Sequence, residues 1–183
     1  LLEVFTLLNW AALALRKSGR TPAPSHERAI EHIAPILRAL RHSDGGLARF
    51  HGGGRGAEGR LDQALATSGV RGGPVDGPAM GFARLSSGRT SVIIDADKPP
   101  QGAASWNGHA STLAFEVTSG RRPLIVNCGS GLQFGEDWGK AGRATPSHSV
   151  LGLTGVSSSR MGPIEPTIHG PRARLVEVPG EVE

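Results

Sequence analysis

The sequence predicts an α+β protein in which an antiparallel helical hairpin is followed by antiparallel β structure. Two observations support this class. The first fifty residues carry apolar side chains at helical spacing, and from "SDGG" (43–46) onward Gly-rich turns separate short runs of β-branched and apolar residues. A chain of 183 residues is long enough for one good hydrophobic core or two modest ones.

Two helices are expected in the first fifty residues. The run from Leu1 to Lys17 is apolar nearly all round and stops at "KSGR", where Gly19 can adopt the left-handed conformation that ends helices. After "TPAP", Ser25 is the expected N-cap of a second helix, and Pro35 should kink or divide that helix. The buried stripe of the second helix is Ile30, Ile33, Leu37 and Leu40.

The first apolar run is expected to be a buried helix and not a membrane span. It contains Glu3 and Asn9, it is short for a bilayer, and it lacks the basic leader of a signal peptide.

Short strands joined by turns are expected in the second part. "GFARL" and "TSVIID" flank "SSGR", and "STLAFEV" and "PLIVN" flank "TSGRR", which are two strand–turn–strand signals. "HSVLGL" and "ARLVEV" are further strand candidates. Between helices and strands, "FHGGGRGAEGRLDQALATSG" indicates a glycine-rich loop with a short helix near Leu61–Ala66. The boundary between the two parts therefore falls between about residues 45 and 75.

Composition limits the classes of partner. The net charge of +4 and a pI near 10.2 suit an anionic partner such as acidic polysaccharide, nucleic acid or lipid headgroups. No aromatic stacking platform or known binding motif favours nucleic acid. The single cysteine, Cys128, excludes an intrachain disulfide framework and a Cys-rich zinc site. No oligomeric state is predicted.

Motifs for phosphate binding or nucleophilic catalysis are weak. "HGGGRG" (51–56) lacks the Lys-Ser/Thr of a P-loop and follows no clear buried parallel strand, so an interdomain loop is the better interpretation. "GVSSSR" does not match a nucleophile elbow, and nothing marks Cys128 as an activated thiol.

The histidines are more informative. His26, His32, His42 and His51 fall in helix or linker, where a surface or interhelix role is the simplest interpretation. By contrast, His109 and His148 each open a strand pattern and Asn127 closes another. Taken singly, each such residue is more often structural than functional. A site is indicated only if the fold brings the three residues close together.

Strand register decides whether these residues meet. Alternation along residues 107–117 puts His109 on the face of Leu113, Phe115 and Val117, which is expected to be buried. A three-residue loop (117–119) sets Asn127 opposite His109, whereas a five-residue loop (118–122) sets it opposite Leu113. A two-residue turn at 119–120 sends it to the other face. The sequence leaves these registers open.

These stretches resemble the heparinase II/III family of polysaccharide lyases. The matching segments run through most of residues 30–160 and include "GHASTLAFEVTSGRRPLIVNCGSG" and "RATPSHSVLGLTGVSSSR". The family combines an incomplete α/α toroid with a C-terminal antiparallel β-sandwich. The resemblance implies that residues 1–50 are terminal toroid helices, 51–75 a linker with a short helix, and 76–183 an incomplete β-sandwich domain.

The resemblance also implies a chemistry. Such lyases cut uronate-containing acidic glycans by β-elimination, in which the sugar carboxylate is neutralised, a base removes the adjacent proton and an acid protonates the leaving oxygen. Tyrosine and histidine usually carry these proton transfers. This chain contains no tyrosine, so the main catalytic residues are expected upstream, and this segment alone should be inactive. The family is bacterial and often periplasmic or secreted.

By resemblance, His109, Asn127 and His148 occupy the family's metal-ligand positions, commonly filled by zinc. Asn127 replaces an aspartate, Asn107 replaces a histidine that is catalytic in some members, and Ser111 replaces another aspartate. A neutral amide is a poorer zinc ligand than a carboxylate. Two interpretations stay open, a weak zinc site and a plain hydrogen-bonded cluster.

Anion contacts and the overall function follow from the same resemblance. Three arginines are candidate contacts to the acidic glycan, namely Arg121, Arg122 and Arg143. The leading hypothesis is the C-terminal part of a lyase. The alternative is a non-catalytic carbohydrate-binding or structural module whose metal site has degenerated, which the altered residues at 107, 111 and 127 favour.

Overall fold

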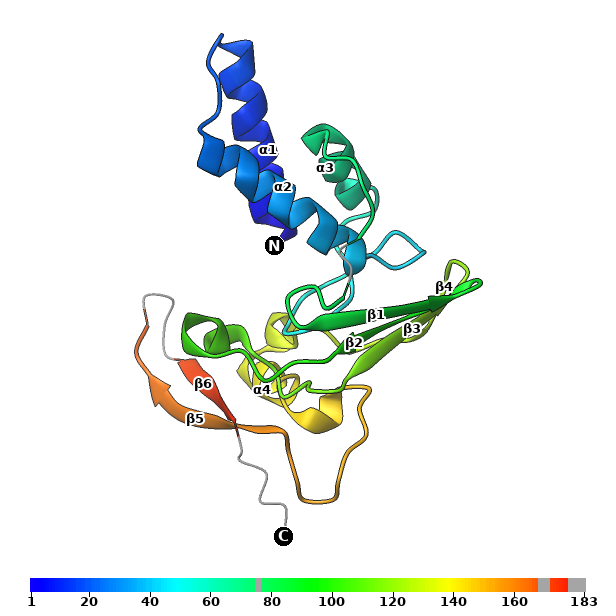
Figure 1. The fold of residues 1–183 in the computed structure, drawn as a ribbon. Helices are drawn as coiled ribbons and strands as arrows, with labels where there is room; N and C mark the ends of the chain where they lie inside the picture. Colours follow the sequence, from blue (N-terminus) through cyan, green and yellow to red (C-terminus); the bar gives the residue numbers. More distant parts are fainter. Residues whose placement is uncertain (75–76, 168–171, 178–183) are drawn as a thin grey trace.

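The computed structural model describes residues 1–74, 77–167 and 172–177, and it has a helical part beside a part rich in strands (Figure 1). The helices α1 (Leu2–Lys17), α2 (Pro24–Ala39) and α3 (Arg60–Ser68) lie together. Gly19, just after α1, has φ 75°, as its expected role at the helix end requires. All three predicted helices are therefore confirmed.

The start of α2 corrects the expected N-cap. The helix begins at Pro24, with Ala23 as its N-cap and no capping hydrogen bond from a side chain, so the assignment to Ser25 is wrong. Proline suits the first helical position because its fixed φ matches the helix and its missing N–H has no partner there anyway. Pro35 lies inside α2 without dividing it.

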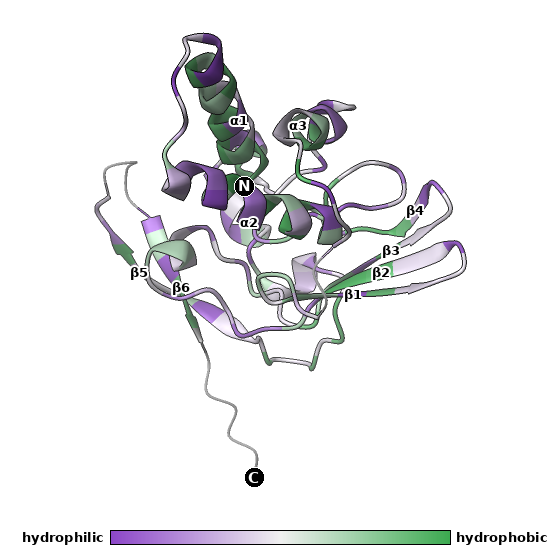
Figure 2. Cartoon of the chain, turned by 45° about the horizontal axis from the view of Figure 1, so that its top comes forward, coloured by the Kyte–Doolittle hydropathy of each residue, from purple (hydrophilic) through white to green (hydrophobic). Residues whose placement is uncertain are grey.

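One hydrophobic core joins the three helices. Its centre is formed by Phe5 of α1 and Leu37 of α2, both fully buried, and α3 adds Leu61 and Ala64. One face of α1 nevertheless stays exposed and apolar, as the colouring in Figure 2 shows. The most exposed apolar side chains of α1 are Val4, Leu7 and Trp10. In the described ranges, every helix is too short or too polar to cross a bilayer.

The strands form two antiparallel sheets. The larger sheet has the order β1-β2-β3-β4, and a separate pair contains β5 and β6. The strands are β1 (Phe82–Ser87), β2 (Thr90–Asp95), β3 (Phe115–Ser119), β4 (Arg122–Ile125), β5 (Ser159–Glu165) and β6 (Arg172–Glu177). The fold is thus α+β with antiparallel sheets, as predicted.

Short helical segments make the connections beside the sheets. The 3₁₀ turn η1 (Gly102–Asn107) precedes β3, and η2 (Leu132–Phe134), α4 (Glu136–Ala141) and η3 (Thr145–Ser147) lie between β4 and β5. In Figure 1 α4 lies beside the large sheet on the side of β5 and β6.

The strand expected through His109 does not exist. β3 begins only at Phe115, and Leu113 sits in a turn with φ 65° and 61% of its surface exposed. The buried face of β3 is formed instead by Glu116 and Thr118. Apolar alternation failed here because two polar side chains find buried hydrogen-bond partners and so take the inner face.

The expected registers between β3 and β4 are also wrong. Ser119 pairs with Arg122, so the turn is Gly120–Arg121, and a bulge follows at Val117/Thr118. Asn127 lies beyond the end of β4. Similarly, "HSVLGL" forms no strand, whereas the unforeseen strand β5 begins in the serine-rich segment that follows.

A second, smaller core connects the helical part to the large sheet. Phe50 of the linker, Ile93 of β2 and Ala114 are buried together. Arg84 of β1 also donates to the carbonyl of Arg41, 2.6 Å away, just after α2. The linker after α2 is therefore packed against the sheet, and this junction positions the histidine site.

Candidate histidine site

Two of the predicted ligands, His109 and His148, lie side by side. Their ring centroids are 5.2 Å apart, and both residues are buried. Two hydrogen bonds fix this approach, because Ala110 N–H donates to Arg143 C=O at 2.9 Å and the side-chain hydroxyl of Thr145 donates to Ala110 C=O at 3.0 Å. The segments before β3 and after α4 are thus joined directly.

Asn127 is anchored beside this pair. Its Oδ1 accepts the backbone N–H of Ser149 at 3.0 Å, next to His148, and its own backbone N–H donates to Glu116 Oε1 at 2.9 Å. The three residues that the resemblance assigned as metal ligands therefore lie near one another without the expected strand pairing. Hydrogen bonds between backbone and side-chain groups of these segments bring them there.

A third histidine, His51, joins the site from the glycine-rich loop. Its Nδ1 accepts the backbone N–H of His109 at 3.1 Å, so the proton must sit on Nε2. That nitrogen lies 3.3 Å from Asp95 Oδ2, which also accepts the Ser111 hydroxyl at 2.7 Å. Asp95 therefore orients both His51 and Ser111.

Glycine permits the loop to approach this closely. Gly52 has φ 73°, and a Cβ at this position would lie 3.1 Å from His109 Nε2. A larger residue would be strained in this backbone conformation and crowded against the imidazole.

Burial keeps the two central histidines uncharged. The pKa of His109 is lowered to about 3 by desolvation and then by the nearby His148, His51 and Arg143, against a smaller opposing effect of the Gly142 carbonyl. The pKa of His148 is lowered to about 4 by desolvation and by His51, with Asp95 opposing. At neutral pH both imidazoles are neutral and keep a lone pair for a ligand.

Several polar atoms of the site lack a partner among the described residues. They are Nδ1 of His109, both ring nitrogens of His148 and Nδ2 of Asn127, all buried. Buried polar groups are normally hydrogen-bonded, so this concentration of free atoms indicates a place where a water molecule, an ion or a ligand group binds.

A second polar network lies behind the site. Glu116 is fully buried, and its Oε2 lies 2.9 Å from His42 Nε2. Its Oε1 accepts the backbone N–H groups of Arg49 and Asn127 at 3.2 and 2.9 Å. On its other side, His42 Nδ1 is 2.9 Å from the hydroxyl of Thr118. One carboxylate thus ties the loop that carries His51 to the segment that carries Asn127.

Sequence reasoning missed His42, His51, Asp95 and Glu116. His42 and His51 were assigned to surface or interhelix positions, but His42 is buried and His51 is half-buried inside the site. Asp95 could have been found from the sequence, because it is a polar residue at the end of an apolar strand pattern. Asn127 was noticed for the same reason. Nothing local in the sequence marks Glu116, because its partners lie far away along the chain.

The other site residues predicted from the sequence do not belong to the histidine cluster. Asn107, at the end of η1, is exposed, and its Oδ1 accepts from Arg172 at 3.2 Å. Arg121 and Arg122 are exposed at the β3–β4 turn. Arg143 is instead half-buried and donates to the carbonyls of Gly108, Ala173 and Ser105 at 2.7, 2.8 and 3.0 Å. Its guanidinium therefore joins η1 to β6, and burial lowers its pKa.

The arrangement suits ligand binding or support of a neighbouring site. Among the described residues, no three His, Cys, Asp or Glu side chains form a metal-binding group. The cluster offers two neutral imidazoles and one amide. Beside it, both ring nitrogens of His51 already have partners, namely the backbone N–H of His109 and the carboxylate of Asp95. Proton transfer by His51 would require one of these two contacts to break.

The antiparallel sheets and the pair His109 and His148 lie in a segment that matches a known family. Residues 70–182, more than half of the chain, match the family described as "Heparinase II/III-like, C-terminal". The chain belongs to this family. The match confirms the resemblance noted in the sequence.

One curated relative is FtsZ-localized protein C of Caulobacter vibrioides (strain NA1000 / CB15N). It is 34% identical over 119 residues, which is 63% of this chain but 20% of that protein. The chain thus spans about a fifth of its relative's length. No solved structure matches the chain.

Proposed function

We propose that this chain is the C-terminal part of a heparinase II/III-like lyase that cleaves uronate-containing acidic glycans by β-elimination. In this proposal α1 and α2 are the last helices of an α/α toroid, and the sheets begin the β-sandwich. The observation that carries the proposal is the gathering of His51, His109 and His148 at the junction of helices and sheet, in a chain of this family. The basic pI of about 10.2 suits an acidic glycan.

The main catalytic groups belong upstream. β-Elimination needs a group that neutralises the carboxylate, a base and an acid. The described chain contains no tyrosine, and its central histidines are buried and neutral. The segment's own contribution is to hold the junction and to present Arg121 and Arg122 as anion contacts. Alone it should be inactive.

A weakly held zinc ion fits the site in part. Two imidazoles that share a tetrahedral zinc have ring centroids roughly 5 Å apart, and those of His109 and His148 are 5.2 Å apart with free ring nitrogens. Asn127 is the third ligand in this proposal, although its Oδ1 already accepts from Ser149. A bound ion would supply a fixed positive charge beside the junction. A neutral amide as third ligand would hold such an ion only weakly.

Periplasmic or secreted localisation accompanies the lyase proposal, since its substrate lies outside the cell. The test uses the whole protein with a panel of uronate glycans such as heparin, hyaluronan and alginate. β-Elimination creates a conjugated double bond in the product, so ultraviolet absorbance should rise with at least one glycan. His109→Ala should weaken this activity, and His32→Ala, an exposed position on α2, should not. No absorbance change with any glycan would contradict the proposal.

The second candidate is a non-catalytic carbohydrate-binding or structural module. Two observations favour it. The side-chain oxygen of Asn127 and the guanidinium of Arg143 are already used inside the protein, and the relative is named for its localisation with FtsZ and not for an enzymatic activity. Under this candidate, the whole protein binds an acidic glycan without cleaving it, or concentrates where FtsZ does. Glycan binding without a rise in absorbance in the same panel would favour this candidate, and binding with a rise in absorbance would favour the lyase.

A further inference from the structure

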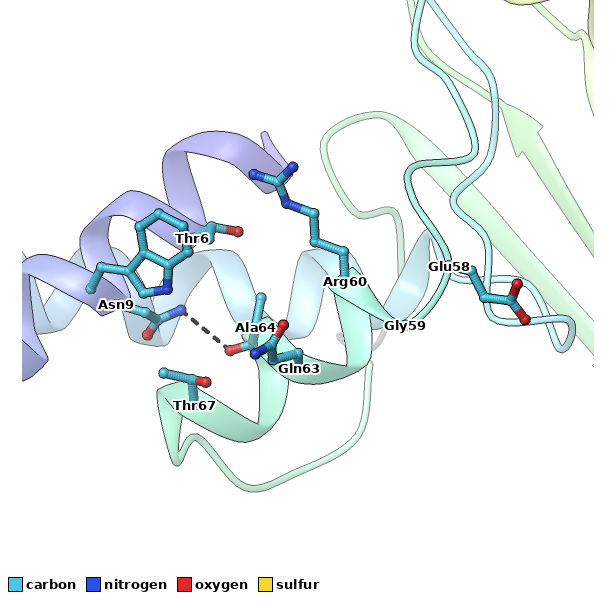
Figure 3. A pocket seen from close by; sticks show the side chains of 9 residues that line it. Thr6, Asn9, Glu58, Gly59, Arg60, Gln63, Ala64 and Thr67 are labelled. Carbon is cyan, nitrogen blue, oxygen red and sulfur yellow. Dashed lines mark hydrogen bonds between the residues drawn. The ribbon is translucent and has the colours of Figure 1, made fainter.

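A pocket of about 380 Å³ lies between α1 and α3, away from the histidine site (Figure 3). Its volume falls in the range of small-molecule sites, roughly 300–1,000 Å³. One wall is formed by Thr6, Asn9 and Trp10 of α1, and the other by Gln63, Ala64 and Thr67 of α3.

Helical spacing puts these residues on two facing surfaces. Thr6, Asn9 and Trp10 are separated by three and four positions, which places them on one side of α1. Gln63 and Thr67 are likewise four positions apart on α3. Between them Ala64 is buried, and its small side chain leaves the space open. Two polar surfaces therefore face each other on helices that otherwise pack through apolar side chains.

The pocket presents hydrogen-bonding groups beside an aromatic ring. Asn9 is buried, and its Nδ2 donates to Ala64 C=O at 3.3 Å, as Figure 3 shows. No hydrogen bond to its Oδ1 is found within the part of the chain that the structure describes. Trp10 is 58% exposed at the pocket, which leaves its indole accessible. The amide and hydroxyl of Gln63 and Thr67 complete the polar lining.

Charge favours a ligand that is rich in hydroxyls over a phosphate. Arg60 lines the pocket, but its guanidinium is paired with Glu3, and Glu58 adds a further carboxylate nearby. No uncompensated positive charge is therefore left for a phosphate. A sugar ring has an apolar face that stacks on an indole and hydroxyls that both donate and accept hydrogen bonds.

We propose that this pocket binds a hexopyranose unit of a glycan, stacked on Trp10 and held by Asn9, Gln63 and Thr67. This inference goes beyond the proposed β-elimination, because the pocket lies away from the histidine site and its Arg60 is already paired with Glu3. The site would hold a glycan chain at a distance from the junction. Binding here also does not depend on a metal.

The test is titration of the whole protein with hyaluronan tetrasaccharide and, separately, with chitotetraose, followed by calorimetry and tryptophan fluorescence. We expect saturable binding of at least one of them. Trp10→Ala should weaken it roughly tenfold through loss of stacking, and Gln63→Ala with Thr67→Ala should weaken it further. Trp138→Ala is the matched control, because Trp138 is similarly exposed but lies on α4.

Failure of both tetrasaccharides to bind, or equal affinity of Trp10→Ala and the unaltered protein, would overturn the inference. Trp10→Phe keeps an aromatic ring and should retain intermediate affinity, which guards against a folding artefact in Trp10→Ala. These outcomes are separate from the lyase proposal, since a protein that binds sugar here without producing unsaturated uronate would contradict only the latter.

Discussion

Glu116 Oε2 and His42 Nε2 lie 2.9 Å apart, and both side chains are almost completely buried. His42 follows the helical hairpin and Glu116 lies on β3, so this pair joins the two parts of the molecule. The carboxylate also accepts the backbone N–H of Asn127 and thereby supports the histidine site. We infer that Glu116 positions the site without taking part in its chemistry.

Removing Glu116 should therefore destabilise the fold. Glu116→Ala leaves His42 and two backbone N–H groups without an acceptor, and we expect a loss of about 3–5 kcal/mol in the free energy of unfolding. Glu116→Gln keeps the Oε1 acceptor and should cost less. Urea denaturation measures both. Glu31→Ala on the exposed side of α2 is the control, and an equal effect of Glu31→Ala and Glu116→Ala would show that the network is unimportant.

Acid should weaken the fold through His109 and His148. Their pKa values are about 3 and 4 in the folded protein but about 6.5 in the unfolded chain. Between these values the unfolded chain binds more protons, so stability is complete above about pH 7 and falls as the pH drops toward 4. We expect Tm to fall by at least about 5 °C over this range.

Two variants assign this acid effect to its source. His109→Gln with His148→Gln should flatten the dependence of Tm on pH, because neither position then titrates. His32→Gln, which alters an exposed histidine of α2, should leave the dependence unchanged. A pH profile that is identical in the double variant and the unaltered chain would contradict the proposed origin.

Restoring a carboxylate at residue 127 should strengthen zinc binding. In Asn127→Asp, one oxygen can still accept the Ser149 N–H while the other replaces the unpaired Nδ2 and adds a negative charge. We expect zinc affinity to rise about tenfold or more, measured by competition with a coloured chelator. His109→Ala should abolish binding, and Asn107→Asp is the control. Unchanged affinity in Asn127→Asp would remove residue 127 from the ligand set.

Arg143 should matter for stability more than for glycan affinity. Its three carbonyl partners connect η1 to β6, and a lysine cannot reproduce that planar arrangement of donors. We expect Arg143→Lys to cost about 2 kcal/mol in unfolding free energy, whereas Arg122→Lys on exposed β4 should cost nothing measurable. Similar unfolding curves for the two variants would argue against the bridging role.

The sequence predicted the helices and the two hairpins of the large sheet because their signals are local. Apolar periodicity defined α1 and α2, and the turns near Gly88 and Gly120 separated the strands. The segment before β3 was mispredicted for the opposite reason. Alternation of Leu113, Phe115 and Val117 suggested a strand with these side chains buried. The buried face is formed instead by Glu116 and Thr118, and Glu116 contacts His42, which is distant in the sequence.

The candidate site was predicted only in part for the same reason. His109, Asn127 and His148 were found through family spacing, and the structure brings them together. His51 and Asp95 were not found, because their contact joins a glycine-rich loop to the end of β2. Such contacts depend on the path of the linker after α2, which no local pattern in the chain specifies.

The most direct test of the lyase proposal is the mass of the products that the whole protein forms from a uronate glycan. Elimination cleaves the chain without adding water and leaves an unsaturated uronate at one new end, whereas hydrolysis adds one water to each cleavage. We predict products with the mass of elimination, at a rate lowered in His109→Ala. Intact glycan, or products that have gained water, would contradict the account.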